Sequence, residues 1–183
     1  MREIELKFRI KDPKVIEKKL SGMGCLFSKP LHQRDTVYTK EGSTEEWRSS
    51  KEGDITVRIR RQDTGAEFNL KQQRSGESDN LEYETKVDDP ETLHHILTVL
   101  GYSPEVTVNK MRRKCKLGEY DICLDSVEEL GDFLEIEKLA EDNVNPEAVR
   151  DELFKAIEPL GLYRTDEEPR GYDTQIFLLH HGK

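Results

Sequence analysis

The sequence has little of what marks several common protein classes. Its 183 residues include three cysteines, Cys25, Cys115 and Cys123, with no CxxC spacing and no clustered histidines. The odd count fits free thiols and argues against a disulfide framework and a zinc site. No apolar run approaches the roughly 18 residues of a membrane span, and no apolar leader opens the chain. We therefore expect a cytoplasmic protein without a membrane partner.

Positive charge is also in the minority. Asp and Glu number 38 against 29 Lys and Arg, so the net charge is −9. Such an acidic chain, without an outward basic patch interleaved with aromatics, argues against a nucleic-acid partner. Charged residues reach 37% of the chain, but the hydrophobic residues recur periodically. We expect one folded domain over residues 1–183 rather than disorder.

The most regular stretch is the first. Its apolar face consists of Ile4, Leu6, Phe8 and Ile10, and its charged face of Glu3, Glu5, Lys7 and Arg9. This alternation predicts a β-strand with one buried face. It recurs and predicts seven further strands, at 34–39, 55–61, 66–73, 81–87, 106–117, 120–126 and 131–139. Two joints are tight turns, so the strands are expected to be mostly antiparallel.

Helices are predicted after three similar signals, Asp12-Pro13, Asp89-Pro90 and Asn145-Pro146, each an N-cap followed by proline at the first helical position. Each ends near a glycine. A tail helix is expected at about 167–180. The polar stretches 41–54 and 74–80 are predicted to be loops that order on ligand binding, with Trp47 as a packing anchor in the first.

Two architectures satisfy this pattern. An open sheet would turn its charges to water, whereas a closed eight-stranded antiparallel barrel of the α+β class would line its lumen with them and carry helices outside. Several predicted strand faces carry a single sign: that of 55–61 is basic, and those of 120–126 and 131–139 are acidic. The acidic set is Glu3, Glu5, Asp125, Glu135 and Glu137, and the basic set is Lys7, Arg58, Arg60, Lys71, Lys110 and Arg112. This separation favours the barrel, because a divalent cation would meet the acids and a polyphosphate the bases.

The first strand resembles the ExExK signature of the CYTH superfamily, the triphosphate tunnel metalloenzymes, in the form Glu3-Ile4-Glu5-Leu6-Lys7. The matching positions continue through Val57-Arg58, Lys71, Asn109-Lys110-Met111-Arg112, Asp125 and 130–137. The tail Glu168-Pro169-Arg170-Gly171-Tyr172 resembles the class IV adenylyl cyclase branch. The resemblance covers nearly the whole chain and implies the closed tunnel barrel.

The resemblance also implies roles for individual residues. Metal ligands for Mg²⁺ or Mn²⁺ would be Glu3, Glu5, Glu135 and Glu137. Triphosphate-binding bases would be Arg58, Lys71, Lys110 and Arg112, with Lys7 and Arg60 as neighbours. The catalytic set would be Glu5, Arg58, Lys110 and Asp125. For Arg60, Lys114, Lys116 and Glu84 an internal salt bridge is an equal alternative. One departure is Asn80-Leu81 before Glu82, where members often carry an arginine; Arg74 is the alternative source of that contact.

Three functions remain open. The leading one is a class IV type adenylyl cyclase that converts ATP to cyclic AMP and pyrophosphate. The second is a metal-dependent triphosphatase for inorganic tripolyphosphate, a nucleoside triphosphate or thiamine triphosphate. The third is a polyphosphate-binding protein without turnover. The expected partner in each case is a small-molecule triphosphate, with a homodimer as the assembly considered.

Overall fold

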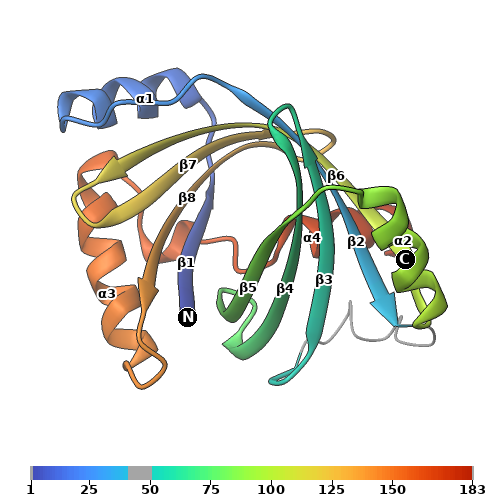
Figure 1. Ribbon diagram of the computed structural model, residues 1–183. Coiled ribbons are helices and arrows are strands. Elements are labelled where there is room, and N and C mark those ends of the chain that lie inside the picture. The colour runs from blue at the N-terminus through green and yellow to red at the C-terminus, as the bar shows by residue number, and fades with distance from the viewer. Residues whose placement is uncertain (1, 41–50, 183) are drawn as a thin grey trace.

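The computed structural model describes residues 2–40 and 51–182. The strands are β1 (Arg2–Arg9), β2 (Leu31–Lys40), β3 (Ile55–Gln62), β4 (Gly65–Gly76), β5 (Asp79–Val87), β6 (Tyr102–Leu117), β7 (Tyr120–Val127) and β8 (Gly131–Ala140). The helices are α1 (Pro13–Gly22), α2 (Pro90–Val99), α3 (Pro146–Ile157) and α4 (Tyr172–His181). All strand pairs are antiparallel, and they close in the order β1-β5-β4-β3-β2-β6-β7-β8 (Figure 1). The predicted barrel is confirmed.

The strand register brings charged residues together on the inner face. Glu5 lies opposite Glu137 and Lys7 opposite Glu135 across β1 and β8. Directly opposed residues of an antiparallel pair point to the same face. The charged strand faces found in the sequence therefore meet inside the barrel.

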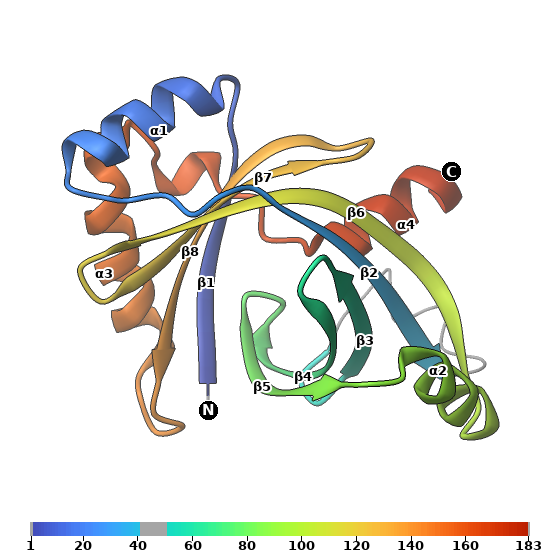
Figure 2. The same cartoon turned by 45° about the horizontal axis from the view of Figure 1, so that its top comes forward.

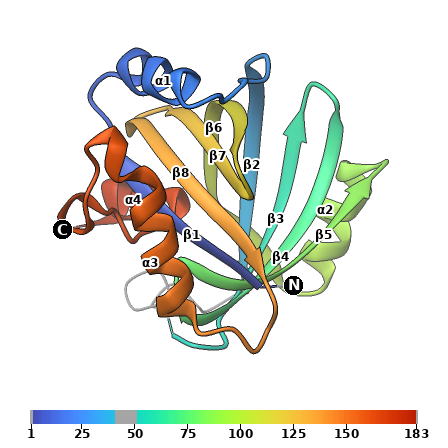
Figure 3. The same cartoon turned by 90° about the vertical axis from the view of Figure 1, so that its left-hand side faces the viewer.

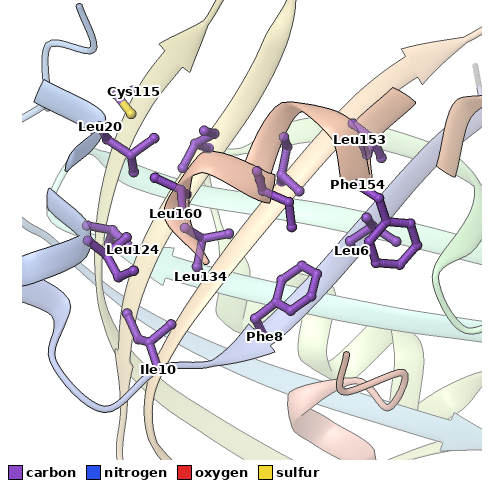
Figure 4. Packing of buried hydrophobic residues seen from close by; sticks show 14 of the residues in the cluster. Leu6, Phe8, Ile10, Leu20, Cys115, Leu124, Leu134, Leu153, Phe154 and Leu160 are labelled. Atoms are coloured by element: carbon purple, nitrogen blue, oxygen red, sulfur yellow. The ribbon is translucent and has the colours of Figure 1, made fainter. Parts of the chain in front are cut away.

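The apolar faces pack outward against helices. Figure 3 shows α3 over the outer side of β1 and β8, and α1 at the upper end of the barrel. Leu6 and Phe8 of β1 are fully buried there beside Leu153 and Phe154 of α3 (Figure 4). Burial of each such side chain contributes about 1.5–3 kcal/mol. This cluster is the main core, and it lies outside the lumen.

The second helix covers another side of the barrel. Figure 2 shows α2 away from α1 and α3, where its Leu97 packs with Tyr38, Val57 and Ile59. The predicted helix starts are confirmed at all three Pro-containing signals. Asp12, Asp89 and Asn145 each accept a hydrogen bond from a backbone N–H in the first turn of their helix. None of the helices that the structure describes is long and apolar enough to cross a membrane.

The tail helix begins later than predicted, at Tyr172 rather than near residue 167. The Glu168 N–H donates to the Lys7 carbonyl at 2.8 Å, so this segment runs beside β1 instead of coiling. β5 pairs with β1 only through Arg2–Ile4, and the segment around Glu168 lies beside the later part of β1. Helix α4 then packs Ile176 and Phe177 with Val37 and Val108, which belong to the lumenal wall.

The prediction of a loop at 74–80 is wrong. β4 runs to Gly76 and β5 starts at Asp79, so this stretch is a tight hairpin. Asp79 explains the order, because it accepts from the Ser75 N–H at 3.1 Å and pairs with Arg2 at 2.6 Å. Of the other predicted loop, residues 41–50, with Trp47, lie outside the described residues.

Candidate functional site

The lumen contains a cavity of about 540 Å³. Its charged lining residues come from seven of the eight strands, from the segment before β3, from the 74–80 hairpin and from α4. They are Glu3, Glu5, Lys7, Asp35, Asp54, Arg58, Arg60, Lys71, Glu77, Glu82, Glu84, Lys110, Arg112, Lys114, Glu135, Glu137 and Asp173. A pocket of this size accommodates a small-molecule ligand. Ten of the eleven residues predicted for the site line it; Asp125 does not.

Three carboxylates converge at one part of this cavity. Ligand oxygens of Glu3, Glu5 and Glu137 lie within 4.8 Å of one another. Burial, followed by the charge of Glu3 and then of Glu5, raises the pKa of Glu137 to about 8. A divalent cation bound among these oxygens would relieve both effects.

Glu135 does not join this cluster, although the resemblance assigns it to the metal. It is hydrogen-bonded to Arg112 and lies 3.4 Å from Lys7 Nζ. Burial alone would raise its pKa, but the charges of Arg112 and Lys7 outweigh burial and lower the pKa well below the usual range. In this structure Glu135 orders the bases.

Lys71 joins the acidic and basic parts of the cavity. Its Nζ lies 2.6 Å from Glu3 and 3.4 Å from Glu82. Burial opposes its charge, but these two carboxylates raise its pKa above the ordinary lysine value. Lys71 is therefore held in its charged form beside the acid cluster.

Sequence reasoning missed Asp35 of β2. Its carboxylate accepts two hydrogen bonds from Arg60, at 2.7 and 2.8 Å, and lies 3.5 Å from both Arg58 and Lys110. Burial would raise its pKa, but the charges of Arg58 and Lys110 and the Arg60 bonds lower it well below the usual range. Asp35 shares its face with Val37 and other uncharged residues, so no single-sign pattern marked it.

Two cations of this wall have donors to offer a ligand. Arg58 Nε is buried and has no hydrogen-bond partner among the described residues. Burial, followed by the charge of Arg112, lowers the pKa of Lys110 to about 8, with Asp35 acting in the opposite direction. A bound polyanion would satisfy the first group and favour the charged form of the second.

Asp125 lies behind Arg112. It accepts from Arg112 Nε at 2.7 Å and from the Tyr172 hydroxyl at 3.1 Å. The ring of Tyr172 in turn faces the Nζ atoms of Lys7 and Lys110, whose distances to the ring centroid are 4.7 and 5.1 Å. Tyr172 was part of the tail motif, but its place among the bases could not be inferred from strand alternation.

Three residues for which the sequence left a salt bridge as an equal alternative occupy different places. Glu84 and Lys114 line the cavity, whereas Lys116 is exposed and pairs with Asp121 at 2.9 Å. Asn80 lines the cavity near the position where the resemblance implies an arginine, and Arg74 is not among the described lining residues. The alternative that Arg74 supplies this contact is not supported.

The donor chemistry fits the metal that the resemblance implies. Three carboxylates and no sulfur or imidazole make up the convergent group. Hard divalent cations such as Mg²⁺ and Mn²⁺ prefer oxygen ligands of this kind and complete their coordination with phosphate oxygens. Glu3, Glu5 and Glu137 are the residues that would hold the ion.

Comparison with known proteins gives a consistent result. The CYTH domain family profile matches residues 1–172. A Methanocaldococcus jannaschii protein provisionally named an adenylate cyclase is 27% identical over 174 residues, covering 94% of this chain and 97% of that protein. The PH1012 protein of Pyrococcus horikoshii has 28% identity and a TM-score of 0.79, covering 93% of this chain and 96% of its own.

A more distant structure has the same fold. It is a Hippeastrum protein described as an adenylyl cyclase candidate with a dominant triphosphatase activity. Its identity is 18% and its TM-score 0.62, with 100% of this chain and 96% of that chain covered.

Proposed function

The chain belongs to the CYTH domain family, and from this premise we propose that it is a metal-dependent adenylyl cyclase that converts ATP to cyclic AMP and pyrophosphate in its tunnel. Proteins of this family are generally enzymes that act on triphosphates. One observation carries the proposal: a three-carboxylate cluster and a wall of arginines and lysines share one cavity. The provisional name of the M. jannaschii relative supports cyclisation as the reaction.

Glu3, Glu5 and Glu137 would hold the divalent ion. When bound, it would neutralise phosphate oxygens and lower the pKa of the hydroxyl that reacts. Carboxylate-only ligation leaves positions for substrate oxygens.

The bases bind and orient the triphosphate. Arg58 offers its unpartnered Nε, Lys71 a charged ammonium beside the metal cluster, and Lys110 a buried ammonium between Asp35 and Tyr172. Cyclisation requires the ribose 3′-oxygen to attack the α-phosphorus while pyrophosphate leaves. Fixed positive groups favour that step, because they stabilise the charge that develops on the leaving pyrophosphate.

Asp125 contributes by positioning. Its bonds to Arg112 and to the Tyr172 hydroxyl fix two groups around the bases, while its own side chain is fully buried. We assign it this role in place of direct contact with substrate.

Hydrolysis of a terminal phosphate is the second candidate. The Hippeastrum structure's description as dominantly a triphosphatase favours it. So does the cavity itself: Tyr172 is the aromatic residue among its described lining, and Lys7 and Lys110 already face that ring. The described lining therefore offers an adenine no free aromatic surface on which to stack. Binding without turnover is the third candidate.

Product analysis distinguishes the three. Purified protein is incubated with ATP, inorganic tripolyphosphate or thiamine triphosphate, each with Mn²⁺ or Mg²⁺, and the products are separated by chromatography. The cyclase predicts cyclic AMP with pyrophosphate, and its loss in Glu5→Ala. Phosphate with ADP or a shortened polyphosphate would overturn cyclisation in favour of hydrolysis. Binding by calorimetry with no product would leave the third candidate.

A further inference from the structure

One carboxylate lies in the middle of the basic wall. Asp35 is 2% exposed and faces three cations from two strands: Arg58 and Arg60 on β3, and Lys110 on β6. Its negative charge repels any polyanion that enters, so its presence in a triphosphate cavity calls for a physical reason. The distances supply one.

The three cations are held in different ways. Arg60 makes two short, parallel hydrogen bonds to Asp35, the fork geometry that fixes a guanidinium most firmly. Arg58 and Lys110 stay at 3.5 Å, in electrostatic contact. Arg60 is therefore the most firmly held of the three, whereas Asp35 makes no short hydrogen bond to Arg58 or Lys110.

Lys110 is the cation whose charge depends most on this arrangement. The charged or titratable groups that face it from the packed elements are Asp35 on β2, Arg60 on β3, Arg112 on its own β6, Asp125 on β7, Glu135 on β8 and Tyr172 on α4. Burial, then Arg112 and Arg60, disfavours its charged form; Asp35, its nearest carboxylate, supports it.

We propose that Asp35 is a positioning residue of the triphosphate site, which keeps Lys110 charged and Arg60 fixed so that the basic wall accepts a polyanion at neutral pH. The inference rests on the proposed function. It assigns Arg60 to the support of the wall, and leaves direct contact with phosphate to Arg58 and Lys110.

The pH dependence of ligand affinity tests this. Binding of inorganic tripolyphosphate, without metal, is measured by calorimetry from about pH 6 to about pH 9.5. Binding by the wild type should weaken as the pH rises through about 8, where the Lys110 pKa lies. The ligand's own protons titrate alike with every variant, so the difference between proteins is the readout.

In Asp35→Asn that weakening should begin at lower pH. A displacement of one unit makes the variant bind about tenfold more weakly than the wild type near pH 9, while at about pH 6 it binds at least as well. Asp35→Glu should move the pH midpoint of binding part of the way back toward the wild-type value. A role in folding alone would instead weaken binding equally at every pH.

Two further variants keep the test decisive if Asp35→Asn does not fold. Arg60→Gln removes a cation that opposes the Lys110 charge, so its midpoint should move to higher pH. Lys110→Arg should remove the contribution of residue 110 to the pH dependence, because arginine stays charged, so adding Asp35→Asn to it should no longer move the midpoint. Unmoved midpoints in folded Asp35→Asn or Arg60→Gln would overturn the inference alone. Failure of the wild type to bind tripolyphosphate would overturn the proposed function with it.

Discussion

At the scale of single residues, the charged groups around a carboxylate determine its pKa and its role. Glu135 and Glu137 stand two positions apart on the same face of β8, yet their pKa values move in opposite directions. Glu137 is buried with other carboxylates, which raises its pKa to about 8. Glu135 is more deeply buried, but Arg112 and Lys7 lower its pKa. Identical side chains are thus placed to bind a metal in one case and a guanidinium in the other.

This difference predicts unequal effects on metal affinity. Glu5→Gln or Glu137→Gln removes a ligand and should weaken Mn²⁺ binding by about 10–100-fold. Glu135→Gln should leave Mn²⁺ affinity within about threefold of wild type, but weaken tripolyphosphate binding because Arg112 loses a partner. Calorimetric titrations with each ligand check this. Equal losses of Mn²⁺ affinity in Glu135→Gln and Glu137→Gln would show that Glu135 is a ligand after all.

Lys110 and Lys116 of β6 make a matched pair for mutagenesis. Lys110 is buried in the cavity, whereas Lys116 is exposed and pairs with Asp121. Lys110→Ala should lower kcat/KM for the triphosphate substrate by about 30-fold or more, as expected for loss of a buried charge contact. Lys116→Ala should leave kcat/KM near the wild-type value. Steady-state kinetics compare them, and a comparable loss in Lys116→Ala would contradict the assignment of the cavity wall.

At the scale of elements, β1 serves two purposes with its two faces. Leu6 and Phe8 hold it to α3, while Glu3, Glu5 and Lys7 face the cavity. The helix therefore stabilises the strand that carries two of the three clustered carboxylates.

The helix contact predicts a stability effect separate from the site. Leu153 of α3 is fully buried, so Leu153→Ala should cost about 2–5 kcal/mol of unfolding free energy through a cavity. Leu26 is 88% exposed, and Leu26→Ala should change it by less than about 0.5 kcal/mol. Urea denaturation measures both. A cost for Leu153→Ala no larger than the Leu26→Ala control would contradict the role of this core.

The sequence predicted those elements whose pattern is set by local physics. Strict alternation gave β1 and β8, and the Asp-Pro and Asn-Pro caps gave α1, α2 and α3. The prediction from sequence failed where contacts between residues far apart in the chain determine the local structure. The 74–80 hairpin depends on Asp79 meeting Arg2, and the late start of α4 depends on Glu168 pairing with Lys7. Asp35 escaped notice because its strand face mixes charged and uncharged residues.

At the scale of the whole molecule, an acidic chain gathers seven bases, together with ten carboxylates, around one cavity. The net charge is −9, yet seven lysines and arginines line the lumen. The closed barrel keeps these bases apart from the acidic exterior. Pairing with lumenal carboxylates, as in Asp35 with Arg60 and Glu3 with Lys71, offsets their mutual repulsion.

Ligand binding should therefore stabilise the fold. A ligand at about 100 times its Kd adds about 2.7 kcal/mol to the unfolding free energy of a protein that binds it only when folded. Thermal denaturation with tripolyphosphate should show a higher Tm than with sulfate at equal ionic strength. Equal Tm values in the two salts would argue against a polyphosphate site.

The most direct measurement of the central claim is a crystal structure of the protein with Mn²⁺ and tripolyphosphate, with the ion located by its anomalous scattering. The account predicts manganese between the carboxylates of Glu3, Glu5 and Glu137, and phosphate oxygens on Arg58, Lys71 and Lys110. Manganese bound elsewhere, or a polyphosphate on the outer surface with the lumen unchanged, would contradict it.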